Sequence, residues 1–204
     1  MKFILAKKEK MTRIFTADGL AHAGTILLAE PVTVTQVKTA DGKDKYSAIQ
    51  VGVGVRKVKN ISKAVLGHTK GKGYTDIREM RGALGAAVGD TIDASVFAVG
   101  DVVQVSGISK GKGFSGVVKR HGFHGGPRSH GQKHTERSPG SIGGSGGRAG
   151  GRVAKGMRMA GRLGTDRVTV TNLKILVVDA NEGKIIVSGA VPGRRGTLLE
   201  VVSK

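Results

Sequence analysis

Residues 106–164 read SGISKGKGFSGVVKRHGFHGGPRSHGQKHTERSPGSIGGSGGRAGGRVAKGMRMAGRLG, and this stretch decides what fold the chain can form. These 59 residues hold 18 glycines, 12 lysines or arginines and a single carboxylate, Glu136. A packed core must offset about 1 to 2 kcal/mol of backbone ordering entropy per residue, and glycine raises that cost. Because the few apolar side chains are scattered, the segment must be ordered by something outside itself.

The charge of residues 106–164 indicates what that partner is. With histidines neutral the segment carries +11, whereas the other 145 residues carry 22 basic and 14 acidic groups. A glycine-rich, strongly cationic segment is typical of a chain that binds a polyanion, above all nucleic acid. A solvated, disordered tail is the alternative. It is disfavoured because the segment is internal and contains apolar residues such as Phe114 and Ile142. The sequence therefore indicates a folded body with a basic arm.

The flanking sequence predicts a mainly β body. Apolar β-branched residues alternate with polar ones and are interrupted by short Gly or Asp turns, which is typical of a small closed antiparallel β-barrel. The predicted strands lie in residues 32–37, 46–55, 91–97, 102–105, 167–179 and 184–190. Asp41-Gly42 suits a hairpin turn, as do residues 181–183. We expect one domain, formed by residues 1–105 and 165–204, with the basic arm 106–164 inserted in it.

One or two short helices are expected in this body. The clearest candidate spans residues 62–68, with Ser62 as its N-cap and Gly67 at its end, inside a small helical insert near 60–82. There is no cysteine, which excludes disulfides and thiolate metal sites. The N-terminal apolar run is too short for a signal peptide, and no stretch of about 18 apolar residues exists. We expect a soluble, intracellular protein.

Two motif matches point to enzyme chemistry and are rejected. Residues 111–116 fit the pattern G-x-G-x-x-G, but residues 117–127 are interrupted by glycines and Pro127, so no helix is expected there. No acidic residue stands where a ribose would need one. A phosphate-binding Walker loop fails as well, because Gly113 replaces its Ser or Thr. We expect no small-molecule substrate and no cofactor.

The histidines and the lone carboxylate of residues 106–164 could suggest a metal site or a catalytic base, but other roles suit them better. His121, His124, His130 and His134 have spacings loosely compatible with zinc, but the surrounding positive charge repels a cation and thiolates are absent. Contacts to RNA bases, phosphates and 2′-hydroxyls suit these rings better. Glu136 lies beside Arg137, so a local ion pair is expected rather than a general base. No metal site and no catalytic residue are predicted.

Six sequence motifs, in this order along the chain, resemble the ribosomal protein L3 family of the bacterial large subunit. They are MTRIF at 11–15, VTQVKT at 34–39, GISKGKGFSGVVKR at 107–120, SPGSIG at 138–143, KGMRMAG at 155–161 and RVTV at 167–170. The resemblance implies a translation-protein-type β-barrel with a long irregular extension, residues 106–164, that threads through ribosomal RNA toward the peptidyl transferase centre. It implies no enzymatic activity.

The resemblance further implies a structural role in the large ribosomal subunit, in the cytoplasm. The chain would bind 23S rRNA near its 3′ end and nucleate subunit assembly, with ribosomal proteins L14 and L19 as neighbours. An alternative class is a free RNA chaperone or nucleoid-type protein that uses the same basic arm outside any particle. The tip also lacks the glutamine that is methylated in some bacterial family members.

Thirteen residues are predicted to bind RNA: Lys110, Lys112, Lys119, Arg120, His121, Arg128, Lys133, Arg137, Arg148, Arg152, Lys155, Arg158 and Arg162. The predicted tip near the peptidyl transferase centre consists of Gly144, Ser145, Gly146, Gly147, Arg148 and Ala149. Arginine suits such contacts because its planar guanidinium both binds phosphate in a bidentate manner and stacks on bases.

Overall fold

The structure is a computed structural model that describes the chain except for residues 1, 17, 43, 83–84, 144–151 and 204. The chain divides into two compact units. The first unit comprises Met1–Ile108 and Arg167–Lys204, and the second unit comprises Ser109–Asp166. The fold is mainly β, as predicted, with two short α-helices in the described residues.

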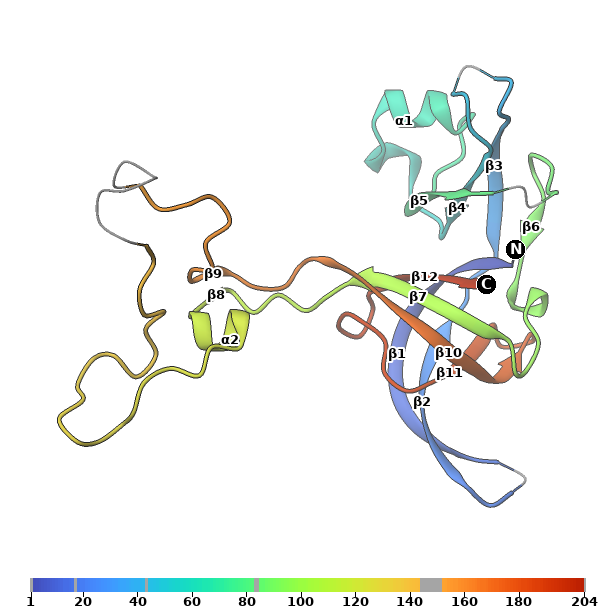
Figure 1. Ribbon diagram of the computed structural model, residues 1–204. Coiled ribbons are helices and arrows are strands. Elements are labelled where there is room, and N and C mark those ends of the chain that lie inside the picture. Colours follow the sequence, from blue (N-terminus) through green and yellow to red (C-terminus); the bar gives the residue numbers. More distant parts are fainter. Residues whose placement is uncertain (1, 17, 43, 83–84, 144–151, 204) are drawn as a thin grey trace. The chain divides into compact units, whose positions relative to one another are not determined.

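Six antiparallel strands of the first unit close into a ring (Figure 1). Around the ring they are β1 (Phe3–Phe15), β12 (Leu198–Ser203), β7 (Val102–Ile108), β10 (Arg167–Asp179), β11 (Lys184–Ser188) and β2 (Ala21–Leu28). The ring closes because β2 pairs with β1 on one side and with β11 on the other. The register of the β1–β2 pair shifts between Lys8 and Met11, which marks an irregularity in this 13-residue strand.

Alternating apolar residues of these strands fill the ring. Ile4, Leu27, Val105, Ile185 and Leu199 are fully buried in one core cluster. Each such side chain contributes about 1.5 to 3 kcal/mol through burial. The first unit therefore contains the core that residues 106–164 could not supply.

A second sheet has the order β5-β4-β3-β6. Its strands are β3 (Val32–Lys38), β4 (Ala48–Val53), β5 (Asp76–Arg81) and β6 (Thr91–Ile92). A second apolar cluster joins this sheet to the ring through Phe3 and Leu5 of β1 and Val202 of β12. Strands β3 and β4 pair antiparallel on either side of Asp41-Gly42, as predicted, but the last pair is Lys38 with Ala48, so the connection is longer than a two-residue hairpin turn.

The predicted helix is present but its ends differ. Helix α1 (Lys63–His68) has Ser62 at its N-cap, yet the Ser62 side chain makes no capping hydrogen bond, and Thr69 rather than Gly67 ends the helix. A 3-10 turn, η1 (Val58–Asn60), precedes it. The expectation of a helical insert up to residue 82 is wrong in its second half, because β5 pairs with β4 there.

A second difference concerns the strand predicted over residues 91–97. Only Thr91 and Ile92 form a strand, and a 3-10 turn, η2 (Ala94–Val96), follows. The Asp93 side chain accepts a hydrogen bond from the Ser95 backbone N–H at 3.0 Å, which stabilises this turn in place of an extended chain.

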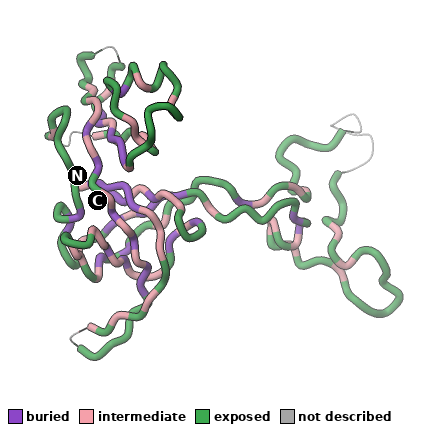
Figure 2. Tube along the Cα trace, turned by 180° about the vertical axis from the view of Figure 1, so that it is seen from behind, coloured by how far each residue is buried: buried purple, intermediate pink, exposed green. Residues whose placement is uncertain are grey.

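The second unit contains little regular structure. It has β8 (Phe114–Ser115), β9 (Gly161–Arg162) and helix α2 (Val117–His121). The expectation that no helix follows the glycine loop is wrong for five residues: Gly122 does not prevent the helix but ends it, in the left-handed conformation with φ 73°. Residues 122–143 and 152–160 form turns and irregular backbone, most of it exposed (Figure 2).

The described helices have at most six residues, far fewer than the 18 or more apolar residues that a membrane-crossing helix requires.

Candidate nucleic-acid interface

The second unit begins and ends as two paired backbone segments. The Ser109 N–H donates to the Asp166 carbonyl at 2.9 Å, and the Lys112 N–H donates to the Leu163 carbonyl at 2.8 Å. Further out, β8 and β9 pair antiparallel, with Phe114 opposite Arg162. These bonds fix the backbone that carries the lysines of residues 110–112, whose side chains are exposed. The cations at this end of the unit are therefore held in place by main-chain bonds.

Helix α2 anchors the returning chain through one carbonyl. Arg120 Nη1 donates to the Met159 carbonyl at 2.7 Å, and His121 Nε2 lies 3.0 Å from the same oxygen. A neutral imidazole with its proton on Nε2 can donate this bond. Both side chains are half-buried. Two predicted RNA-binding residues thus have a role inside the protein, which is to hold the segment that carries Arg158.

A second close approach occurs at Gly125. The Gly126 N–H donates to the Glu136 carbonyl at 2.9 Å and closes a loop between these two residues. Gly125 has φ 78°, and a Cβ atom at this position would lie 2.1 Å from the Glu136 carbonyl oxygen. Only glycine allows the two backbone segments to come this close.

The lone carboxylate of residues 106–164 has a different partner from the one predicted. Arg128 Nε lies 2.7 Å from Glu136 Oε1, so the ion pair forms across the loop neck and not with the adjacent Arg137. Glu136 and Arg137 lie in a turn, and the closed loop brings Arg128 back to Glu136. Arg137 remains exposed.

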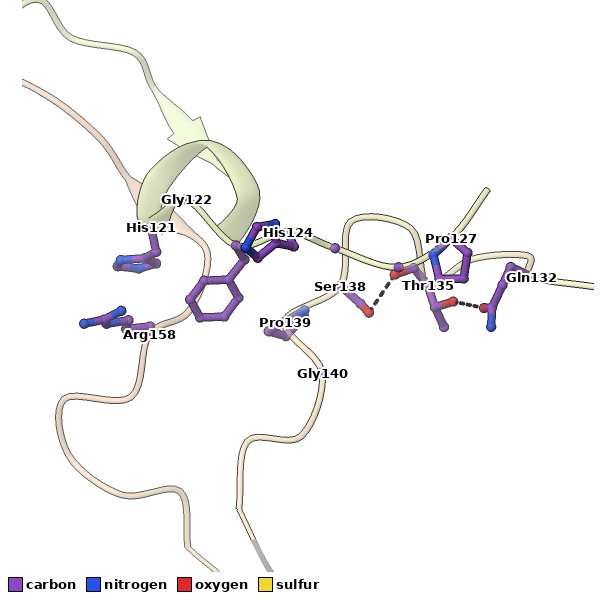
Figure 3. A pocket seen from close by; sticks show the side chains of 13 residues that line it. His121, Gly122, His124, Pro127, Gln132, Thr135, Ser138, Pro139, Gly140 and Arg158 are labelled. Atoms are coloured by element: carbon purple, nitrogen blue, oxygen red, sulfur yellow. Dashed lines mark hydrogen bonds between the residues drawn. The ribbon is translucent and has the colours of Figure 1, made fainter. Parts of the chain in front are cut away.

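A cavity of about 690 Å³ lies between these anchored segments (Figure 3). His121 and Arg158 are at one end of it in the figure, and Pro127, Thr135 and Gln132 are at the other. Phe123 also lines the cavity, and its ring centroid lies 6.0 Å from that of His121. The Ser138 hydroxyl donates to the Thr135 carbonyl at 2.9 Å, which orders the polar end.

Most predicted RNA-binding cations are exposed and lack an acidic partner within the described part of the second unit. They are Lys110, Lys112, Lys119, Lys133, Arg137, Arg152, Lys155, Arg158 and Arg162. Ion pairs in the first unit are more frequent. For example, Glu200 binds both Arg78 and Arg167, and Lys38 binds Glu79 at 2.7 Å. The second unit therefore presents cationic groups that no carboxylate in its described residues neutralises.

The predicted tip lies outside the described residues. It comprises Gly144, Ser145, Gly146, Gly147, Arg148 and Ala149. Its role stays a prediction.

The rejected enzyme and metal alternatives have no additional structural support. The glycine loop 111–116 leads into α2, which has five residues and not the long helix on which a dinucleotide-binding unit depends. Over the described ranges, no three His, Asp or Glu side chains lie close enough to hold a metal ion.

One feature of the surface, the cavity, was not predicted as a site, because nothing in the sequence indicates that Met159 would be an anchor. A second basic group surrounds α1 and was predicted only in part. The likeness of TKGKGYT at 69–75 to SKGKGFS at 109–115 predicts a basic turn that contacts phosphate, and a run of cations without a carboxylate extends between Asp44 and Asp76. Its exposed members are Arg56, Lys57, Lys59, Lys63, Lys70 and Lys72.

Comparison with known proteins agrees with the sequence motifs. The family profile described as ribosomal protein L3 matches residues 84–191. The chain is 47% identical to a large ribosomal subunit protein uL3 of Herpetosiphon aurantiacus, over 97% of this chain and 94% of the relative. It is 46% identical to the uL3 protein of Cutibacterium acnes, over 100% of this chain and 92% of the relative. For the uL3 protein of Pelodictyon phaeoclathratiforme the identity is 45%, over 100% and 99%. The chain belongs to the ribosomal protein L3 family.

Proposed function

We propose that the chain is a structural, non-catalytic constituent of the large ribosomal subunit in the cytoplasm and that it binds 23S rRNA near its 3′ end. Its membership of the ribosomal protein L3 family supports this proposal, as do relatives named large ribosomal subunit proteins that match nearly its full length. The chain would join the subunit early and nucleate its assembly, beside proteins L14 and L19.

One observation carries the RNA-binding part of this proposal: the second unit presents nine exposed cations without an acidic partner in its described residues. Its backbone is rich in glycine, so phosphate groups can approach main-chain N–H donors closely. Lysine and arginine supply the charge that neutralises phosphates and releases their counterions. An acidic protein surface would also bind cations, but a glycine-rich backbone adapts better to the irregular path of folded RNA.

In this proposal the ring of strands is a translation-protein-type β-barrel, and the second unit is an extension that threads through rRNA. Lys110, Lys112 and Lys119 would neutralise phosphates near its base. The tip around Arg148 would approach the peptidyl transferase centre. The exposed cations of residues 152–162 would line the returning segment.

Ultraviolet crosslinking of the protein in cell extract, with sequencing of the attached RNA, tests this function. Crosslinks concentrated in the 3′ region of the large-subunit rRNA and near the peptidyl transferase loop are the expected result. Diffuse crosslinks over many RNAs would contradict it and favour a free RNA chaperone. Stoichiometric co-sedimentation with large subunits in high salt separates the same two functions.

A matched pair of triple variants makes this test specific. Replacing Lys110, Lys112 and Lys155 by glutamine removes three unpaired charges of the second unit and should reduce the rRNA crosslinks. Replacing Lys2, Lys7 and Lys184 by glutamine removes the same charge from surface ion pairs of the first unit, each of which contributes little to stability. Equal loss in both triple variants would indicate nonspecific attraction.

A further inference from the structure

The cavity of the second unit has the dimensions and the groups of a nucleotide site. Its volume of about 690 Å³ lies within the range of about 300 to 1,000 Å³ that is usual for small-molecule pockets. The cavity is largely open to solvent, so one base with its ribose can lie in it while remaining partly exposed. Its walls come from two chain segments that hydrogen bonds hold together, because the Met159 carbonyl is bound by Arg120 and His121. The cavity is therefore built by the fold of this unit.

The two ends of the cavity differ in chemistry. At one end the guanidinium of Arg158 is exposed and has no acidic partner in the described unit. The half-buried ring of Phe123 also lines the cavity, with its centroid 6.0 Å from that of His121 and its plane tilted by 43° to it. A phosphate suits the cationic group, and an aromatic ring provides a surface on which any base can stack.

The other end carries hydrogen-bonding groups. The Thr135 hydroxyl donates to Gln132 Oε1, which leaves the amide N–H groups of Gln132 available to a ligand (Figure 3). The His124 ring also lines the cavity and is exposed. Polar groups opposite a stacking surface are the arrangement with which proteins recognise the edge of an unstacked base.

We propose that this cavity binds one unstacked nucleotide of the RNA, with its base against Phe123, its edge toward Gln132 and its phosphate at Arg158. This inference rests on the proposed function, since it names the part of the RNA that this unit takes up. Arg120 and His121 are positioning residues for the site, because they hold the segment that carries Arg158.

The test uses the full chain bound to deproteinised large-subunit rRNA from the source cells. Irradiated complexes are digested to single nucleotides, and mass spectrometry locates the residues that carry an adduct. We expect an adduct within residues 121–128, at one rRNA position. Stacking of a base on an aromatic ring contributes a factor of about 5 to 150 in affinity. Phe123→Leu should therefore reduce the adduct yield at least fivefold, and Phe123→Tyr, which keeps the ring, should retain it.

Phe114→Leu is the matched control, since Phe114 is exposed in the same unit and does not line the cavity. It should leave the adduct at residues 121–128 unchanged. If Phe123→Leu binds rRNA and forms the adduct like the wild type, the cavity site is wrong while the proposed function stands. If the wild type does not bind the rRNA at all, both are wrong.

A competition experiment identifies the source of the nucleotide. An equal mixture of AMP, GMP, CMP and UMP at 1 mM, roughly the weak end of ligand affinities, should leave the adduct yield unchanged, because a free nucleotide lacks the neighbouring phosphate contacts. Displacement by micromolar mononucleotide would overturn the proposal in favour of a free-nucleotide site.

Discussion

The two units of this chain are stabilised in different ways. The first unit buries two apolar clusters. Several of its basic side chains form ion pairs with carboxylates of the same unit. In the described second unit only Ser115, Val117 and Gly164 are buried, and the apolar clusters include none of its residues. Backbone pairing and two side chains on the Met159 carbonyl hold it together instead. The second unit thus keeps its cationic residues exposed, because the apolar core lies in the first unit.

Replacing one phenylalanine by alanine in each unit should show the largest difference in the free energy of unfolding. Phe3 is 1% exposed in the cluster that joins the two sheets, whereas Phe114 is 82% exposed in the second unit. Phe3→Ala should reduce the free energy of unfolding by about 3 to 5 kcal/mol, because it removes buried area and leaves a cavity. Phe114→Ala should change it by no more than about 0.5 kcal/mol. Urea unfolding followed by circular dichroism measures both, and equal losses would contradict the contrast.

A glycine substitution should affect the second unit alone. Gly125→Ala combines left-handed strain of about 1 to 2 kcal/mol with a Cβ atom placed against the Glu136 carbonyl. We expect faster hydrogen exchange at the Gly126 N–H and an unchanged melting temperature of the first unit.

Gly131→Ala is its control, since Gly131 has φ 79° and open space around it. It introduces the same backbone strain without the close approach. If both variants exchange equally fast at Gly126, the close approach does not hold the loop.

Removing the Arg120 side chain, which binds the Met159 carbonyl, should have a smaller effect on stability. Arg120→Ala removes a hydrogen bond from a charged donor that is half-buried, so local opening near Met159 should become easier by about 1 to 2 kcal/mol. Lys119→Ala is the neighbouring control, with an equal change of charge and helix propensity at an exposed position. Hydrogen exchange in residues 156–160 reports the difference, and similar exchange in the two variants would show that Arg120 does not anchor the segment.

The smallest effect should be a pH dependence of the first unit. Hydrogen bonds from Lys38 and then Tyr46 lower the pKa of Glu79 below its ordinary value of 4.5. A carboxylate with a lowered pKa in the folded state stabilises the protein above pH 4.5 and loses this contribution as the pH falls through its folded pKa. The bonds to Glu79 and then Tyr46 raise the pKa of Lys38 above 10.5, so its contribution is complete below pH 10.5 and is lost as the pH rises further.

Glu79→Gln should therefore flatten the fall in stability between pH 5 and pH 3, about the range in which carboxylates titrate. Chemical denaturation at a series of pH values measures this. Glu136→Gln, in the ion pair of the second unit, should leave the acid dependence of the first unit unchanged. An unaltered slope in Glu79→Gln would show that the Lys38 pair adds nothing to this dependence.

Local patterns predicted the strands best where alternation was clear. The strand predicted over residues 167–179 has those bounds as β10. Strands β1 and β2 were not predicted. Lysines and a glutamate interrupt the alternation of β1 after Ala6, and each of the two strands has one partner that is distant in sequence, β12 for β1 and β11 for β2. The same holds for β5, whose polar sequence DIREMR is a strand only because β4 supplies its backbone partners.

The sequence predicted which cations form the candidate interface, but it did not predict how the chain folds to arrange them. Charge is a property of composition, so the cations could be located before any fold was known. The Met159 anchor and the Arg128–Glu136 pair depend on where the chain turns back, and composition contains no information about that.

The salt dependence of binding to purified large-subunit rRNA tests the central claim most directly, with the full chain and with a chain that lacks residues 111–161. If about eight phosphates are neutralised, the logarithm of the full chain's association constant should fall with the logarithm of salt concentration at a slope of roughly −6 to −7. The shortened chain should keep the circular dichroism of a folded β protein and lose most of this slope. A shortened chain that is folded and keeps the full slope, or one that does not fold, would contradict the account.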